Sequence, residues 1–590
     1  METLEEILKI YDDLNKKKFD YYEVSKQLLD LPEKEKLRNE VMSELLAFSF
    51  QDNTGEKWGT YLGPLTTWVK KDTGEEISRP DYKEITDYDI TRWEKRLEQT
   101  KNPMLQMRYS GLIYDFKKKI MGTNPDFHKV IKPYAESILA VVEGEYPDNI
   151  VESYIYAERL FEVACSKGLD EIFEKAKKVL WNLDCQYGED DKPGLWGCHF
   201  QIMMKYLKKY SNYEADIVKM NEDRFNRLEL NIIDEHKRND SFIHILFDQC
   251  KLLCDYYKHK HNSEAIKSHI DRLLQATRVF INTNGALWSQ EMLQRIQHLY
   301  RKFQLDKEAN KLYIDIQDIG SAVFKEMQVS EYTIPIDKKQ LDAYIKDLTE
   351  VPAELAFKRY LYRNTPNIDI ERQRQKEEAE EAPLLDLIRT TIFDANGNPI
   401  SNIGVGENAE EQKLMNGMYR RMLITAYLLK FDVEAMEGKG YLNKDVVMKA
   451  LKDSPIIADE QKDIVKRGME AYFEKDYLVA CHLLVPQFEC AIRRLVALQG
   501  GEIMRSNKDS KNGNEYISLD GLLDSDTLKE IFNESVRMYY KNLFTDKCGW
   551  NIRNTISHGL LRTDGFNSTI ANRVVHAFML LSLVKEVKEE

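Results

Sequence analysis

The sequence predicts a mainly α-helical, multi-domain protein. Apolar residues recur at three- and four-residue spacing along most of the 590-residue chain, which is the helical period. Glycine and proline are scarce, with 27 and 15 residues, so there are few of the breaks that a turn-rich β protein needs. Only one pair of short runs carries a clear strand signal. We therefore expect helices throughout, interrupted by one short β-hairpin.

Residues 1–146 form the first predicted domain. An amphipathic helix opens it, with apolar side chains at Leu4, Ile7, Leu8, Tyr11 and Leu14. A less regular aromatic stretch follows, broken by an Asp-Thr-Gly sequence at 72–74 and by Arg79-Pro80. We interpret this part as an N-terminal helical domain.

The apolar spacing of residues 147–329 predicts a series of consecutive helices. The clearest periodic segments are 154–168, 169–183, 242–257 and 263–281. Consecutive helices of about 15 residues with short connections are typical of an α-solenoid-like stack, although no repeat of fixed length is visible. Such a stack is either a plain scaffold or a surface that binds an unknown protein or ligand trigger.

Residues 330–406 form a predicted linker with two distinct parts. The mixed charge run at 371–381 is typical of a solvated helix or a linker. The runs 390–393 and 400–405 enclose an Asn-Gly pair at 396–397, which is a strong hairpin signal. We place the main domain boundary in this linker.

Residues 407–590 return to the helical pattern. Within them, four amphipathic segments, which run approximately over 459–472, 478–495, 526–543 and 568–584, indicate a compact helical bundle at about 455–588. Pro486 lies inside the second segment, where it removes a backbone donor and is expected to kink the helix.

Charge and composition exclude several classes of protein. The net charge of −14 argues against coating of nucleic acid or of an anionic membrane by the whole surface. The longest apolar stretch, 574–584, is too short to span a bilayer, which needs about 20 residues. Eight sparse cysteines and an acidic amino end without a secretory pattern indicate a cytoplasmic protein with reduced thiols and no membrane partner.

One constellation carries recognisable chemistry, and it lies between the last two bundle segments. There Arg553, Asn554 and His558 occur within Arg-Asn-Thr-Ile-Ser-His-Gly. Arginine is permanently cationic and its forked donors match phosphate oxygens. Histidine, with an ordinary pKa near ~6.5, can accept or give a proton at neutral pH. With the 2′-hydroxyl of RNA as nucleophile, this pair suffices for strand scission without a metal or cofactor.

Helical geometry constrains how these three residues act. Asn554 and His558 are four residues apart and share a helix face, so Asn554 is placed to orient the imidazole. Arg553 and His558 diverge by about 140° on a regular helix. They converge on one phosphate only if the chain bends at the helix start, or if the second group comes from another copy. Both arrangements are open from the residues alone, and the second makes a homodimer through the C-terminal bundle the active form. The other possibility for His558 is a capping or core histidine, and Asn554 is equally suited to cap a helix.

The charge around this constellation is locally basic. Between residues 535 and 576 there are six cations and two anions in a chain that is acidic overall. This favours a cationic cleft for RNA, with ordinary solvated side chains as the alternative. The residues that we expect to contact RNA are Arg537, Lys541, Lys547 and Arg562, and Arg573 adds to the local charge.

The string Arg553-Asn554-x-x-x-His558-Gly559 resembles the signature of the HEPN superfamily (higher eukaryotes and prokaryotes nucleotide-binding domain). It is most similar to a domain-of-unknown-function group with this same string, which also occurs in the endoplasmic-reticulum membrane-associated RNA degradation protein. The run Leu484-Val485-Pro486-Gln487-Phe488-Glu489 resembles that group's second recurrent stretch. The resemblance covers about residues 455–588.

The resemblance implies a HEPN-like bundle and a metal-independent, generally dimeric RNase of the kind found in toxins and antiviral defence or abortive-infection systems. A tyrosine that is adenylylated in some HEPN toxins is replaced here by Leu560, which speaks against that form of control.

Two alternatives remain. Cys250-x-x-x-Cys254 followed by His259 and His261 has the ligand types of a zinc site, although its helical pattern favours thiols in a core. The bundle also suits a non-catalytic adaptor that binds RNA or nucleotide, or only dimerises, while the helical stack recruits a protein. Walker, dinucleotide, His-Glu-x-x-His and Gly-x-Ser-x-Gly strings do not occur in the sequence, so ATPases, metalloproteases and α/β-hydrolases are disfavoured.

Overall fold

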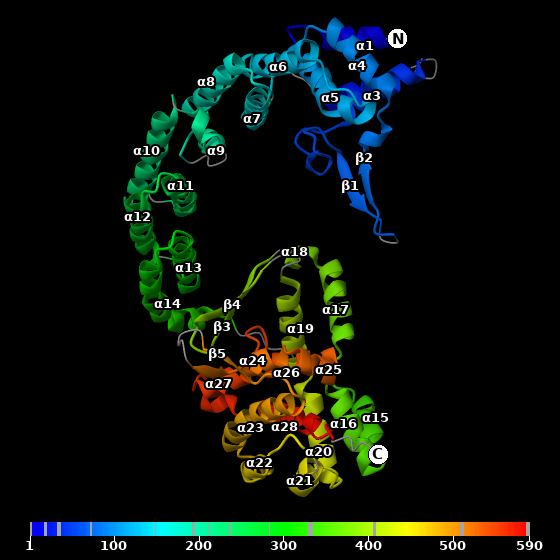
Figure 1. Cartoon of the computed structure of the whole chain (residues 1–590), viewed down its shortest axis with the longest axis vertical. Helices are drawn as coiled ribbons and strands as arrows, with labels where there is room; N and C mark the ends of the chain where they lie inside the picture. Colours follow the sequence, from blue (N-terminus) through cyan, green and yellow to red (C-terminus); the bar gives the residue numbers. More distant parts are fainter. Residues whose placement is uncertain are drawn as a thin grey trace. The chain divides into compact units, whose positions relative to one another are not determined.

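The chain is described here by a computed structural model and divides into two compact units (Figure 1). Unit 1 comprises residues 1–283 and 295–309, and unit 2 comprises residues 284–294 and 310–590. The structure describes residues 3–16, 20–31, 37–70, 73–147, 149–190, 195–210, 212–234, 236–237, 239–281, 284–328, 333, 335–386, 388–404, 409–452, 454–507 and 513–585.

Unit 1 is mainly helical. Its helices are α1 (Leu4–Tyr11), α2 (Tyr21–Leu29), α3 (Arg38–Ser49), α4 (Asp87–Gln99), α5 (Pro103–Met121), α6 (Lys132–Glu143), α7 (Ile150–Lys167), α8 (Asp170–Tyr187), α9 (Cys198–Lys205), α10 (Glu214–Ile233), α11 (Asp240–His259) and α12 (Ser263–Ile281). Strands β1 (Thr66–Val69) and β2 (Glu76–Arg79) form an antiparallel hairpin. Helices α13 (Ala286–Lys302) and α14 (Asp306–Glu326) contribute residues to both units.

The first five helices of unit 1 enclose one core. Trp93, Tyr109 and Phe116 are fully buried in it, together with the apolar face of α1. The capping box of Thr3 and Glu6 starts α1 where the sequence pattern begins, because the two side chains bond the free backbone N–H groups of that end.

From α5 to α8 and from α10 to α12, each helix packs against the next in sequence (Figure 1). Helix α6 also packs against α8, and α10 against α12. Short caps such as Asn149 before α7 and Gly168 after it, which is left-handed at φ 67°, separate the helices. The predicted helices 154–168, 169–183, 242–257 and 263–281 correspond to α7, α8, α11 and α12.

Unit 2 is also mainly helical. Its helices are α15 (Lys338–Thr349), α16 (Ala353–Arg363), α17 (Ile368–Glu381), α18 (Pro383–Asp386), α19 (Glu410–Ile424), α20 (Ala426–Gly438), α21 (Lys444–Lys452), α22 (Asp459–Phe473), α23 (Tyr477–Leu498), α24 (Leu519–Leu523), α25 (Asp526–Ile531), α26 (Glu534–Phe544), α27 (Ile552–Ser557) and α28 (Ser568–Leu581). Two antiparallel hairpins, β3 (Thr390–Phe393) with β4 (Pro399–Ile403) and β5 (Met504–Ser506) with β6 (Asn514–Tyr516), complete it.

Helices α23 and α28 pack against each other in the large core of unit 2. Phe488 of α23 stacks on Phe544 of α26 with ring centroids 4.1 Å apart, and Phe578 of α28 meets it edge-on. Pro486 lies inside α23, which continues through it. This packing fixes the helices on either side of α27.

The mainly helical prediction is confirmed, with two differences. The sequence indicated one hairpin, and β3–β4 is that hairpin, but the described part of the chain contains two more. The sequence does not predict these two hairpins for two reasons. Strand β1 is exposed along its whole length, so it does not need the alternation of apolar and polar residues that marks a half-buried strand. Strands β5 and β6 have only three residues each, which is too short for a pattern. The third bundle helix is broken into α25 and α26, because Phe532 is extended and Asn533 caps a new helix.

Candidate functional site

The short helix α27 is held in place by the turn that precedes it. The backbone N–H of Trp550 donates to the carbonyl of Asn542 at 2.7 Å, and Gly549 passes directly over the same peptide. Asn551 is left-handed at φ 49° and begins the helix. Ile552 and Ile556 are buried one turn apart, which fixes the helix by one face and leaves the other toward solvent.

Arg553 forms an ion pair with a residue that the sequence analysis did not assign a role. Its Nε donates to Oε2 of Glu489 on α23 at 2.9 Å, and the side chain remains 28% exposed. The other carboxylate oxygen of Glu489 accepts from Arg493 at 2.7 Å. The two strings on which the family resemblance rests, 484–489 and 553–559, are therefore in direct contact through this pair.

Asn554 links Arg553 to the helix start. Its Oδ1 accepts from Nη1 of Arg553 at 3.0 Å, and its Nδ2 donates to Oδ1 of Asn551 at 2.7 Å. The sequence led us to expect that Asn554 orients the imidazole of His558. In the described part of the chain, the hydrogen bonds of this amide instead serve Arg553 and Asn551.

His558 ends α27 and is exposed to solvent. Its backbone N–H donates to the carbonyl of Asn554 at 3.1 Å, and Gly559 then leaves the helix at φ 65°. Among the residues that the structure describes, the imidazole makes no hydrogen bond or ion pair. Arg553 and His558 thus occupy opposite ends of one short helix, and only the arginine is already paired.

The four predicted RNA-contacting cations lie at three different places in unit 2. Arg537 and Lys541 on α26 line a groove of about 910 Å³ between α17, α19 and α26, where Lys541 pairs with Asp524 at 2.9 Å. Lys547 is exposed in the connection between α26 and α27. Arg562 is exposed, and its Nη2 lies 3.4 Å from Oδ1 of Asn396 in the β3–β4 turn.

The expected cationic cleft needs one correction. The sequence analysis counted Arg573 among the six cations that make this region basic. In the structure, however, its side chain is only 2% exposed and is buried within unit 2. Residues 571–581 of α28 are all buried, so this part of the helix has no solvent-facing side on which Arg573 could lie. The arginine is therefore not part of a surface that meets RNA.

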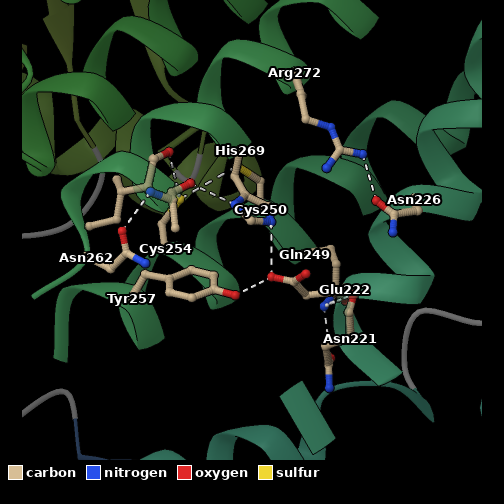
Figure 2. Close-up of polar contacts among 12 residues, drawn as sticks. Asn221, Glu222, Asn226, Gln249, Cys250, Cys254, Tyr257, Asn262, His269 and Arg272 are labelled. Atoms are coloured by element: carbon tan, nitrogen blue, oxygen red, sulfur yellow. Dashed lines mark hydrogen bonds and ion pairs between the residues drawn. The ribbon is translucent and has the colours of Figure 1, made fainter. Parts of the chain in front are cut away.

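The cysteine pair on α11 belongs to a polar network between α10, α11 and α12 (Figure 2). The Cys250 and Cys254 sulfurs are buried and 3.9 Å apart. His269 of α12 has its Nδ1 2.8 Å from the carbonyl of Ala265, and the hydroxyl of Tyr257 donates to Glu222. Burial raises the pKa of the Cys250 thiol, which favours the protonated form over a metal-binding thiolate.

Residue clusters of the kind that hold a metal ion, with three or more histidine, cysteine or acidic side chains, are not found in the described ranges. None of the helices with described residues combines the length and the hydropathy that a membrane crossing requires.

Glu489 is the site residue that sequence reasoning missed. It is 64 residues from its partner along the chain, and no spacing rule connects the two. Its place at the end of the string 484–489 was the one available signal. No protein-family model matches this chain, and a comparison with curated proteins finds no match.

Proposed function

We propose that unit 2 carries a metal-independent endoribonuclease site of the HEPN type, built from Arg553 and His558. The observation that supports this most is the ion pair between Arg553 and Glu489. It joins the two sequence strings that resemble the HEPN group, although they are far apart along the chain. A joint role for both strings gives a reason for that contact.

The proposed chemistry uses the groups that remain free at α27. Nη2 of Arg553 has no hydrogen-bond partner among the described residues and is available to a phosphate oxygen. The exposed imidazole of His558 takes the proton of the 2′-hydroxyl or gives one to the departing 5′-oxygen. The 2′-oxygen attacks phosphorus as the bond to the 5′-oxygen breaks, which leaves a 2′,3′-cyclic phosphate and a 5′-hydroxyl.

The placement of the two groups supports a homodimer as the active form. Arg553 and His558 lie at opposite ends of α27, and Glu489 and Asn554 hold the arginine at its end. Two copies that meet through the C-terminal bundle can bring Arg553 of one and His558 of the other onto one phosphodiester.

We also propose that the enzyme is conditionally active. A protein or a ligand that binds the α-solenoid-like helices of unit 1 is the trigger, and phage defence or abortive infection is the corresponding biological role.

The test compares two exposed histidines of unit 2 in the full-length chain. His558→Ala is expected to lose cleavage of single-stranded RNA by at least about 100-fold, the scale of a lost general acid or base. His482→Ala is the matched control, because His482 is also exposed but lies outside the turn and helix at residues 549–557. Its ring stacks on that of Phe566, with the ring centroids 4.9 Å apart. Equal loss in both variants, or none in either, would sink the enzyme proposal.

One observation favours the second candidate, a non-catalytic adaptor that binds RNA or nucleotide or only dimerises. The charge of Arg553 is engaged by Glu489, as in a purely structural ion pair. If neither the wild type nor the variants cut RNA under any activating condition, while self-association requires residues 455–588, the adaptor is the better account.

A further inference from the structure

A half-open cavity of about 580 Å³ lies in unit 2, and its lining does not include the turn and helix at residues 549–557. Its wall comes from α16, α17, α19 and α28, with additional residues from the start of α26. This volume is within the range of small-molecule sites, about 300–1,000 Å³. We call it the Arg573 cavity, after the buried arginine in its wall.

Arg573 is the unusual residue of this cavity. Its side chain is 2% exposed, and its Nη1 donates to the backbone carbonyl of Asn364 at 2.8 Å and its Nη2 to that of Met422 at 3.4 Å. Its Nε is buried without a hydrogen-bond partner, and in the described part of the chain no carboxylate lies within ion-pair distance of the guanidinium. Arginine is almost never fully buried unless it is paired.

The acidic side chains near the cavity already form ion pairs with arginines other than Arg573. Glu371 accepts from Arg374 and from Arg421, each at 3.0 Å. Asp432, which is fully buried, accepts from Nε of Arg363 at 2.8 Å. The described cavity wall carries one carboxylate, that of Glu371, against five basic side chains, Lys358, Arg363, Arg374, Arg421 and Arg573.

The rest of the wall is mostly apolar. Met418 and Met422 of α19 and Leu428, Leu580 and Leu583 line it together with Ile370. A ligand that fits must therefore offer an anionic group to the arginines and an apolar body to the methionine and leucine side chains. Water alone would leave the buried guanidinium without a counter-charge.

We propose that the Arg573 cavity binds a small organic oxyanion with an apolar body, in which a carboxylate or a phosphate ester pairs with Arg573. This binding site is independent of the proposed RNase chemistry. The shared feature of the two ligand types is a forked set of oxygens that matches a guanidinium.

The experiment is a calorimetric titration of the full chain with three ten-carbon probes below their micelle-forming concentrations. Decanoate and n-decyl phosphate carry the anion, and decan-1-ol has the same apolar body without charge. We expect saturable binding of at least one anion, at least about tenfold tighter than the alcohol, and the stronger anion identifies the headgroup.

Two variant pairs locate the binding. Thr425→Trp fills the cavity from its wall and is expected to abolish binding. Leu423→Trp, two residues away, is the control, because Leu423 is 48% exposed and lies outside the wall. Arg573→Gln is expected to weaken anion binding about tenfold or more, and Arg573→Lys to restore part of it.

If Arg573→Gln does not fold, the tryptophan pair decides alone. The proposal is overturned if neither anion binds, if decan-1-ol binds as tightly as the anions, or if Thr425→Trp binds like the wild type.

Discussion

At the scale of single residues, the candidate site depends on one shared carboxylate. Glu489 is 15% exposed and neutralises part of two arginine charges, Arg493 and Arg553. The sequence identified Arg553, Asn554 and His558 as a group because they are close along the chain. It could not identify their partner, because a contact across 64 residues depends on how α23 and α27 pack and leaves no periodic trace.

Replacement of Glu489 by glutamine tests this shared ion pair. Glu489→Gln leaves two partly buried arginines without their counter-charge, so the free energy of unfolding should fall by about 1–3 kcal/mol. Urea denaturation measures this. Glu474→Gln is the control, because Glu474 is 63% exposed in its ion pair with Arg467, and such pairs contribute about 0–1 kcal/mol. An equal effect of both substitutions would show that Glu489 does not hold Arg553.

At the scale of elements, strong periodicity predicts helices well and weak elements poorly. The predicted helix 263–281 matches α12 at both ends, since its apolar face is buried against α10 and α11. The predicted helix 526–543 is broken instead, because the capping bond from Val536 N–H to Asn533 starts α26. The helix propensities and apolar spacing of residues 526–543 do not indicate that two short capped helices are more stable here than one continuous helix.

The turn before α27 gives a prediction at this scale. A Cβ on residue 549 would collide with the backbone carbonyl of Asn542, which cannot move without weakening its hydrogen bond from Trp550 N–H. Gly549→Ala should therefore lower the free energy of unfolding by about 1–3 kcal/mol, as overpacking does. It should also reduce RNA cleavage, since the turn positions Arg553. Circular dichroism melts and the cleavage assay measure the two effects.

Gly417→Ala provides the comparison for that experiment. Gly417 lies inside α19 with open space where its Cβ would be, so alanine should stabilise this helix by about 0.5–1 kcal/mol. A neutral Gly549→Ala would contradict the idea that the turn is tightly packed.

At the scale of the whole molecule, each unit buries a histidine whose lowered pKa makes the folded state less stable in acid. In unit 2, burial and the nearby Arg573 charge lower the pKa of His576 to about 3. In unit 1, burial lowers the pKa of His199 to about 3 but raises that of Asp184 to about 7. The raised pKa of Asp184 acts in the opposite direction to that of His199, and burial raises the pKa of Asp546 in unit 2 with the same opposing sign.

The direction in which His576 changes the free energy of unfolding with pH follows from the neutral imidazole that the folded protein holds. Below the unfolded pKa of about 6.5, the unfolded chain binds a proton that the folded chain refuses until about pH 3. The contribution of His576 is thus fully present above pH 6.5 and is lost by up to about 1.4 kcal/mol per pH unit as the pH falls toward 3.

Calorimetric unfolding of the wild type and of His576→Gln between pH 7.5 and pH 5 measures this. Glutamine can keep the contacts of His576 with Tyr539 and the Leu361 carbonyl without titrating. We expect a steeper loss of stability in the wild type. Parallel slopes would show that the buried imidazole does not refuse the proton.

The central claim is that Arg553 and His558 act on one phosphodiester through the RNA's own 2′-hydroxyl. The most direct test is the mass of the product ends when the full-length protein cuts single-stranded RNA in excess EDTA. The account predicts 2′,3′-cyclic phosphate and 5′-hydroxyl ends, unchanged rates in EDTA and no cleavage of the matching DNA. Products with 5′-phosphate ends, or activity that disappears with EDTA, would contradict it.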